Sequence, residues 1–289
     1  MSMSRGPRRA WSASSTHWHR RRHRERTMKP IFPTVIAFDL DAETLWTGRN
    51  PDNAARPVLL SHGAFEIREA LSPILAVLAA HGVSSTFFVP GATADRYPDA
   101  VRAIVDAGHE IASHGHGHRP IPDLDARQEE DELVRGLDSL EAVTGKRPTI
   151  WRSPSWEWSD RTLDLLLKHG ITVSANFHDR LRPYRHERDG KPLPLVELPV
   201  QWHLTDNPYF FYGGQVGRVV RPASVAREVW EEEFSGLYER PGAYYHLCLH
   251  PQLIGHPGRL KMLDAHLGFV KGHDGVRFMT ASEAAATVE

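Results

Sequence analysis

The strongest constraint on the fold is a regular alternation of short β-forming runs with longer amphipathic stretches. Eight runs rich in β-branched and aromatic residues predict strands at residues 34–40, 85–90, 109–113, 149–152, 171–175, 195–200, 244–249 and 276–280. Apolar residues at helical spacing predict helices between most of them, at residues 67–81, 97–107, 126–144, 160–169, 224–238 and 259–270. This alternation is typical of βα units around a parallel sheet.

We therefore expect an α/β fold, an irregular (β/α) barrel of seven or eight parallel strands. An open doubly wound sheet would show the same alternation, and periodicity alone does not separate the two. The 289 residues suffice for one such domain. Residues 176–193 and 206–221 lack clean periodicity, so we expect them to form long loops.

The first 27 residues differ from the rest of the chain in charge. They hold eight arginines and one acidic residue, so that of 35 basic and 36 acidic residues in all, 27 and 35 lie beyond them. We expect residues 1–28 to be a disordered Arg-rich extension, or to precede a true start at Met28. Residues 29–289 would form the single catalytic domain. Nucleic acid could bind an Arg-rich tail, but it is not the partner we expect.

Two further features of the sequence bear on location and metal binding. No apolar run approaches the roughly 20 residues that cross a bilayer. The basic N-terminus also lacks the apolar segment that follows in a secretory signal, so we expect a cytoplasmic protein without a membrane partner. Because Cys248 is the single cysteine, any bound metal must be held by histidines and carboxylates.

Two pairs of polar residues stand at predicted strand ends. Asp39 and Asp41 end the first strand and share a face of it, although aspartates there can also be turn residues or helix caps. His114 and His118 follow the third strand at a spacing typical of metal ligands, which 18 histidines also produce by chance. Position favours function, because α/β enzymes build their sites at the carboxyl ends of parallel strands.

One carboxylate and two imidazoles fit a catalytic divalent ion such as Zn²⁺. We expect Asp41, His114 and His118 to hold this ion, which would activate water and polarise a carbonyl. Asp39 would accept the proton of the attacking water. His250, at the end of a later strand, would protonate the leaving nitrogen.

Several motifs, in order along residues 34–280, resemble those of the polysaccharide deacetylase family, the NodB homology group. They are FDLDAE, GVSSTFFVPG, AGHEI, SHGHGH, RSPSW and LCLHPQLIG. The resemblance implies the barrel, the same three metal ligands, Asp39 as base, His250 as acid and Arg152 as the arginine that orients the base. Leu40 separates the two aspartates and a glycine follows the first ligand histidine, as in the cytoplasmic branch. That branch contains peptidoglycan-deacetylase-like enzymes and hydrolases of cyclic imides or ureides such as allantoin.

We therefore predict a metal-dependent hydrolase of non-peptide carbon–nitrogen bonds. Its substrate would be an N-acetylated sugar or a small cyclic amide or imide, bound by Trp156, Tyr209 and Phe211. The long loops are compatible with a homo-oligomer. One alternative is a haloacid dehalogenase-type phosphatase, which needs a lysine and an acidic pair where this chain offers a histidine pair. The other is a non-catalytic carbohydrate-binding relative, which would have lost an acid, base or ligand, and none is missing.

Overall fold

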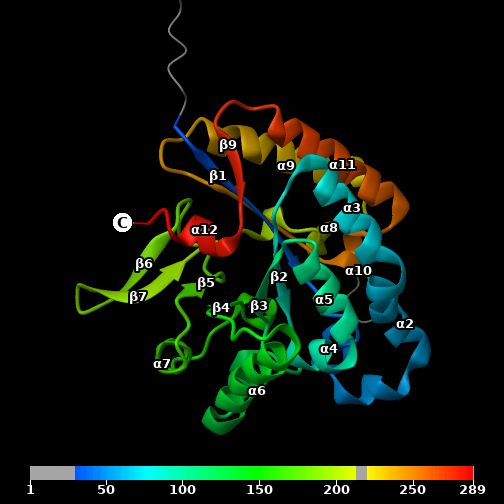
Figure 1. Cartoon of the computed structure of the whole chain (residues 1–289), viewed down its shortest axis with the longest axis vertical. Coiled ribbons are helices and arrows are strands. Elements are labelled where there is room, and N and C mark those ends of the chain that lie inside the picture. Colours follow the sequence, from blue (N-terminus) through cyan, green and yellow to red (C-terminus); the bar gives the residue numbers. More distant parts are fainter. Residues whose placement is uncertain (1–29, 213–219, 289) are drawn as a thin grey trace, which may run out of the picture.

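The structure, a computed structural model, describes residues 30–212 and 220–288. The predicted extension at residues 1–28 lies outside this range, and so does part of the loop predicted at 206–221. Within the described residues, a nine-stranded sheet runs through the centre of the molecule (Figure 1). The strands are β1 (Phe32–Asp39), β2 (Thr86–Val89), β3 (Glu110–Ser113), β4 (Ile150–Trp151), β5 (Val173–Ser174), β6 (Tyr184–Arg188), β7 (Lys191–Glu197), β8 (Tyr245–Leu249) and β9 (Val276–Met279).

The strand order is β6-β7-β5-β4-β3-β2-β1-β8, and β9 pairs with β1. Every pair is parallel except β6 with β7. The expected α/β fold with a mostly parallel sheet is therefore confirmed. Regular pairing does not close the sheet into a barrel within the described residues, but a single parallel bridge from Thr205 to Cys248 in β8 connects the region beyond β7 to the other end.

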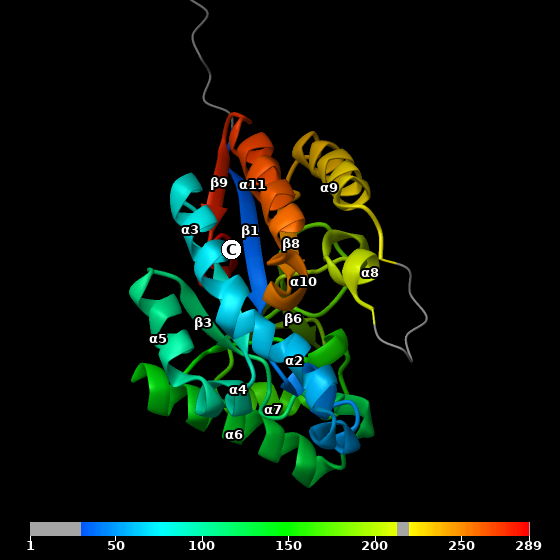
Figure 2. The same cartoon turned by 90° about the vertical axis from the view of Figure 1, so that its right-hand side faces the viewer.

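Helices cover the sheet. All six predicted helices are present, within a few residues of the expected bounds. Figure 2 shows α3, α9 and α11 along β1 and β8, with α4, α5 and α6 near β3. A capping box at Asp125 and Gln128 begins α6, and Gly145 in the left-handed conformation ends it. The helices are α1 (Thr44–Thr47), α2 (Pro57–Phe65), α3 (Leu71–His81), α4 (Gly91–Arg96), α5 (Pro98–Asp106), α6 (Ala126–Thr144), α7 (Thr162–Lys168), α8 (Asn207–Phe210), α9 (Ala223–Tyr238), α10 (Pro251–Ile254), α11 (Pro257–Lys271) and α12 (Ala281–Ala285).

The prediction of a loop is confirmed for residues 176–183 but wrong for residues 184–193, because β6 and the start of β7 form an antiparallel hairpin there. Asp189 and Gly190 make its turn, with φ angles of 52° and 71°. Positive φ at both positions gives a turn that matches the twist of the strands. Prolines at 192 and 194 argued against a strand in the sequence, since proline is uncommon in sheet interiors.

The alternation of side chains along β1 positions the candidate site. Ile36 and Phe38 are buried in the apolar cluster beneath α3, α9 and α11. Val35 and Ala37 belong to a second cluster on the other face of the sheet. Because successive strand residues point to opposite faces, the Asp39 side chain lies on the same face of the sheet as Val35 and Ala37.

Candidate active site

Asp41, His114 and His118 come together at the carboxyl ends of β1 and β3. One ligand-type atom from each lies within 4.8 Å of the other two, and all three side chains are buried. The Nε2 atoms of His114 and His118 are each 3.6 Å from a different Asp41 oxygen, longer than a good hydrogen bond. Within the described chain, neither Asp41 oxygen has a hydrogen-bond partner. A buried carboxylate without partners is costly, and this donor set fits a divalent ion.

Both histidines are prepared to act as ligands. Nδ1 of His114 donates to the carbonyl oxygen of Arg152 at 2.8 Å, which holds the ring with Nε2 directed toward Asp41. Burial lowers the pKa of His118 to about 4, although the Asp41 charge opposes this shift. His118 is therefore neutral near pH 7, as metal binding requires.

Strained backbone conformations gather around this cluster. Four of the five non-glycine residues with positive φ in the described ranges lie here: Ala42 (50°), His118 (56°), Ser155 (61°) and Trp156 (59°). Ala42 follows a ligand aspartate, and the other three line the pocket above the cluster. Such conformations cost on the order of 1–3 kcal/mol each and persist where the surrounding structure enforces them. Their concentration here indicates a functional constraint rather than chance.

Asp39 lies beside the ligand cluster and is held by Arg152. Nη1 of Arg152 donates to Oδ1 of Asp39 at 2.5 Å, and the ring nitrogens of His114 and His250 are each 3.9 Å from Oδ2. Burial alone would raise the pKa of Asp39, but the Arg152, His114 and His250 charges outweigh it and lower this pKa to about 2. Asp39 is thus a carboxylate near pH 7, with an oxygen directed into the site.

Arg152 is fully buried and fixed on several sides. Its Nε donates to the Ala175 carbonyl oxygen at 3.2 Å, and Nη2 lies 3.0 Å from Nε2 of His246. The guanidinium stacks on Phe88, 3.8 Å from the ring centroid. These contacts leave the guanidinium one orientation, in which it meets Asp39.

His250 is paired with a buried carboxylate. Its Nδ1 lies 2.7 Å from Oδ1 of Asp206, and its backbone nitrogen donates to Oδ2 at 2.9 Å. Burial alone would lower the pKa of His250, but the charges of Asp206 and Asp39, with the Asp206 hydrogen bond, raise it to about 10. The imidazole is therefore protonated near pH 7 and able to donate a proton from Nε2.

A small pocket of about 70 Å³ opens above these residues. Trp156 forms part of its wall, and the ring of Trp202 packs 4.5 Å from that of Trp156. The full lining comprises Asp39, Leu45, Arg49, His114, His118, Ser155, Trp156, Trp202, Thr205, Asn207 and His250. The structure thus brings the predicted acid, base, two ligand histidines and one predicted aromatic residue to one cavity.

The structure places the other two predicted substrate residues, Tyr209 and Phe211, outside this lining. The Tyr209 hydroxyl donates to the His203 carbonyl oxygen at 3.0 Å, and its ring meets Trp230 edge-on. Phe211 is buried and stacks on Trp46 at 5.3 Å. Both rings pack against other aromatic rings instead of lining the pocket.

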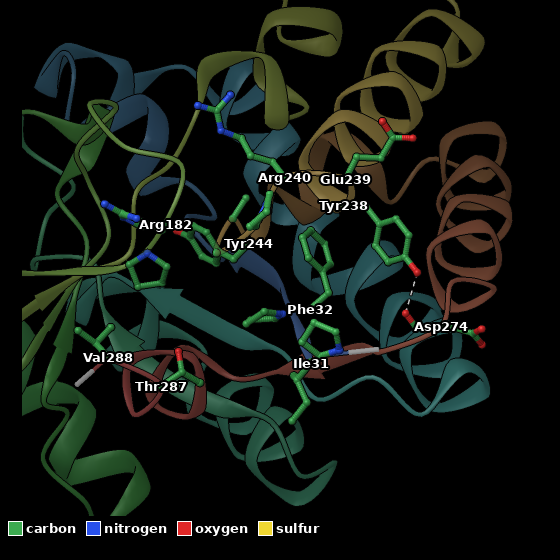
Figure 3. A pocket seen from close by; sticks show the side chains of 16 residues that line it. Ile31, Phe32, Arg182, Tyr238, Glu239, Arg240, Tyr244, Asp274, Thr287 and Val288 are labelled. Carbon is green, nitrogen blue, oxygen red and sulfur yellow. Dashed lines mark hydrogen bonds between the residues drawn. The ribbon is translucent and has the colours of Figure 1, made fainter. Parts of the chain in front are cut away.

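A larger hollow of about 750 Å³ lies at the opposite end of the sheet (Figure 3). It is lined by Phe32 at the start of β1, Tyr244 just before β8, and Val288. In the same view, the Tyr238 hydroxyl donates to the Asp274 carbonyl oxygen at 2.7 Å. These are the amino ends of the strands, whereas catalytic residues of such folds gather at the carboxyl ends. The ligand cluster, not this hollow, is the candidate active site.

Comparison with known proteins identifies the family. Residues 55–174 match the family described as polysaccharide deacetylase. A crystal structure of a putative polysaccharide deacetylase from Mycobacterium smegmatis is 32% identical, covers 90% of this chain and 94% of its own, and superposes with a TM-score of 0.83. The chain belongs to the polysaccharide deacetylase family.

Two other similar proteins extend the comparison. A peptidoglycan deacetylase of Helicobacter pylori is 29% identical over 285 residues, covering 87% of this chain and 94% of its own. The Puue allantoinase structure, 22% identical, covers 88% of this chain and 89% of its own with a TM-score of 0.76, and shows that it shares the fold. The family resemblance expected from the motifs is therefore confirmed, whereas the cytoplasmic branch stays a prediction.

Two residues of this deacetylase-family site were not predicted from the sequence. Asp206 is isolated within a segment expected to be a loop, and only the folded chain brings it to His250. Glu66 lies in a helix and is fully buried. Burial and the neighbouring Asp41 charge raise the pKa of Glu66 well above its ordinary range. A glutamate among apolar helical residues was the available signal, but glutamates are common on helices.

In the described ranges, no helix combines the length and the apolar character needed to cross a bilayer.

Proposed function

We propose that this member of the polysaccharide deacetylase family is a metal-dependent hydrolase of non-peptide carbon–nitrogen bonds. Asp41, His114 and His118 would hold a divalent ion, which we propose to be Zn²⁺. The buried ligand triad, in which neither Asp41 oxygen has a hydrogen-bond partner within the described chain, carries this proposal. When bound, such an ion lowers the pKa of water and polarises a carbonyl oxygen.

The remaining residues supply the proton transfers. Asp39 would accept the proton of the attacking water, and Arg152 would hold its carboxylate in place through Oδ1. His250 would donate its proton to the leaving nitrogen, which would otherwise depart as an unstable anion. Because the Asp206 carboxylate keeps His250 protonated, acid and base start in complementary states.

Two substrate classes fit this chemistry. The similarity to a peptidoglycan deacetylase supports an N-acetylated amino sugar. The pocket, however, measures about 70 Å³. This is below the roughly 300 Å³ at which pockets for drug-sized ligands begin. An acyl group or one small ring would enter beside Trp156. We therefore favour a small amide, imide or ureide, with the amino sugar as second candidate.

Metal analysis and a substrate panel test the proposal. The purified full chain should contain about one divalent ion, and a chelator should abolish its activity until Zn²⁺ is restored. The panel compares succinimide-type rings, allantoin and N-acetylglucosamine oligomers under identical conditions. Faster deacetylation of the oligomers than opening of any ring would assign the amino-sugar substrate. Hydrolysis that survives complete removal of metal would overturn the metal-dependent mechanism.

A further inference from the structure

A glutamate just after α2 makes a hydrogen bond to the turn that carries Asp41. Glu66 begins a π-helical turn, Glu66–Ala70, and its Oε2 accepts a hydrogen bond from the backbone nitrogen of Ala42 at 2.6 Å. Ala42 follows Asp41 directly and has a φ of 50°. A Cβ on Gly63 would lie 2.4 Å from the Ala42 carbonyl carbon, so only glycine lets the helix approach and bring Glu66 into reach.

Glu66 has few other hydrogen-bond partners for a buried carboxyl group. Oε2 also lies 3.3 Å from Nε2 of Gln252 in α10, two residues after His250. The second oxygen, Oε1, has no partner in the part of the chain that the structure describes. Burying a carboxyl group with few partners is costly, so its presence needs a reason. The proton transfers proposed above do not use it.

The loop between the two ligand histidines is held in the same manner. Oε2 of Glu132 in α6 accepts from the backbone nitrogens of His116 and Gly117, at 3.1 and 2.7 Å. A Cβ on Gly136 would lie 2.3 Å from the Gly115 carbonyl oxygen, so α6 packs directly against this loop. The ring of His116 lies outside the ligand cluster, 3.5 Å from Asp95. The loop backbone, rather than that ring, is what Glu132 organises.

A neighbouring glutamate has a different role. Glu129, about one helical turn before Glu132, is also buried. Its oxygens accept from the hydroxyls of Ser159 and Thr162, and from Nε of Arg161. These contacts join α6 to α7 and its preceding loop. Glu129 therefore shares burial, helix and residue type with Glu132, but its hydrogen bonds in the described residues go to the α7 region and not to the ligand loop.

We propose that Glu66 and Glu132 are positioning residues of the metal centre. Glu66 accepts one backbone N–H group and Glu132 accepts two, each in a turn that carries ligands. Asp41 and the two histidines would therefore keep ligand geometry before an ion arrives. The inference rests on the proposed function, because it requires these three residues to bind a divalent ion. Loss of such supporting hydrogen bonds typically weakens metal affinity about 10- to 100-fold.

The test is the Zn²⁺ dissociation constant of the full chain, measured by competition with a chromophoric chelator. Glu66→Ala and Glu132→Ala should each weaken binding about 10- to 100-fold. Glu66→Gln and Glu132→Gln should stay close to the unaltered protein, because the amide oxygen accepts the same N–H groups. Glu129→Ala is the matched control, and it should lower the melting temperature while leaving Zn²⁺ affinity unchanged.

Three outcomes separate the possibilities. Folded Ala variants that bind Zn²⁺ as tightly as the unaltered chain would overturn the inference. If the Ala variants do not fold, Glu66→Asp and Glu132→Asp replace them, since these keep the carboxyl group but are one methylene too short. Asp variants that bind Zn²⁺ more tightly than Gln variants would show that the carboxyl group, not its reach, matters, and would also overturn the inference. An unaltered chain that binds no Zn²⁺ would instead remove the proposed function, and the inference with it.

Discussion

Asp206 contacts His250 through both of its carboxylate oxygens, one meeting the ring Nδ1 at 2.7 Å and the other the backbone nitrogen at 2.9 Å. The backbone contact fixes the start of α10, and the ring contact fixes the imidazole orientation. With Nδ1 committed to Asp206, only Nε2 is left to face the pocket. The same carboxylate thus sets both where the proton is presented and how strongly it is held.

Asp206→Asn should move the alkaline limb of the pH profile to lower pH. The folded protein holds the His250 proton up to a pKa of about 10, so activity that needs this proton is lost as pH rises through that value. Removing the carboxylate charge lowers the pKa, and the loss should begin nearer to the ordinary histidine value of about 6.5. A bound divalent ion would lower the pKa in both proteins. Measuring kcat/KM across pH checks the shift, and coincident alkaline limbs would contradict it.

Asp39→Asn should keep the metal and lose turnover. Asparagine retains the shape and accepts a hydrogen bond from Arg152, but it cannot take a proton from water. General bases contribute about 100- to 10,000-fold in rate, and a loss of kcat in that range is expected. Metal content and kcat are measured on the same sample. Near-normal kcat at every pH, with full metal content, would exclude Asp39 as the base.

Zn²⁺ should stabilise the folded chain, and His118→Ala should remove this effect. Ligand at 100 times its dissociation constant adds about 2.7 kcal/mol to the free energy of unfolding. For a chain of this size each kcal/mol corresponds to roughly 2–4 °C in melting temperature, so a rise of about 5–10 °C is expected. Thermal melts with and without Zn²⁺, and again after chelation, measure it. An equal rise in the His118→Ala variant would place the ion elsewhere.

The fold could be predicted from the sequence where periodicity was strong. The helix α6 has both a capping box and a C-terminal glycine, and its predicted bounds match those observed. The β6–β7 hairpin could not be predicted, because its exposed charged residues and prolines give no apolar alternation. Antiparallel pairing between β6 and β7, rather than local preference, makes these residues strands.

The site divides in a similar way. Asp39, Asp41 and His250 stand at strand ends, and parallel strands bring such ends to one edge, so sequence position was sufficient. Asp206 follows no strand of its own, and its closeness to His250 depends on the whole chain. The direction of the Phe211 ring also depends on tertiary packing, here against Trp46.

A shortened chain that starts at Met28 should fold and turn over as the full chain does. The first described strand begins at Phe32, and every residue proposed for chemistry lies beyond it. The Arg-rich composition of the first 27 residues also offers few apolar groups to bury. Melting temperature and kcat/KM of the two chains are compared. A loss of either in the shortened chain would show that the extension belongs to the catalytic domain.

Trp156→Ala should raise KM more than Tyr209→Phe does. Trp156 is only 8% exposed, yet it lines the pocket, and its ring packs 4.5 Å from that of Trp202. Removing an aromatic contact costs about 0.5–1.5 kcal/mol beyond the lost area. A rise in KM approaching about tenfold is therefore expected, at unchanged metal content. Tyr209→Phe removes only a hydroxyl that donates to the His203 carbonyl oxygen outside the pocket, so KM should hardly change.

Separate measurement of kcat and KM decides between the two residues. A larger KM effect for Tyr209→Phe would mean that bound substrate extends beyond the small cavity toward α8, which would favour the longer amino-sugar substrate over a compact ring.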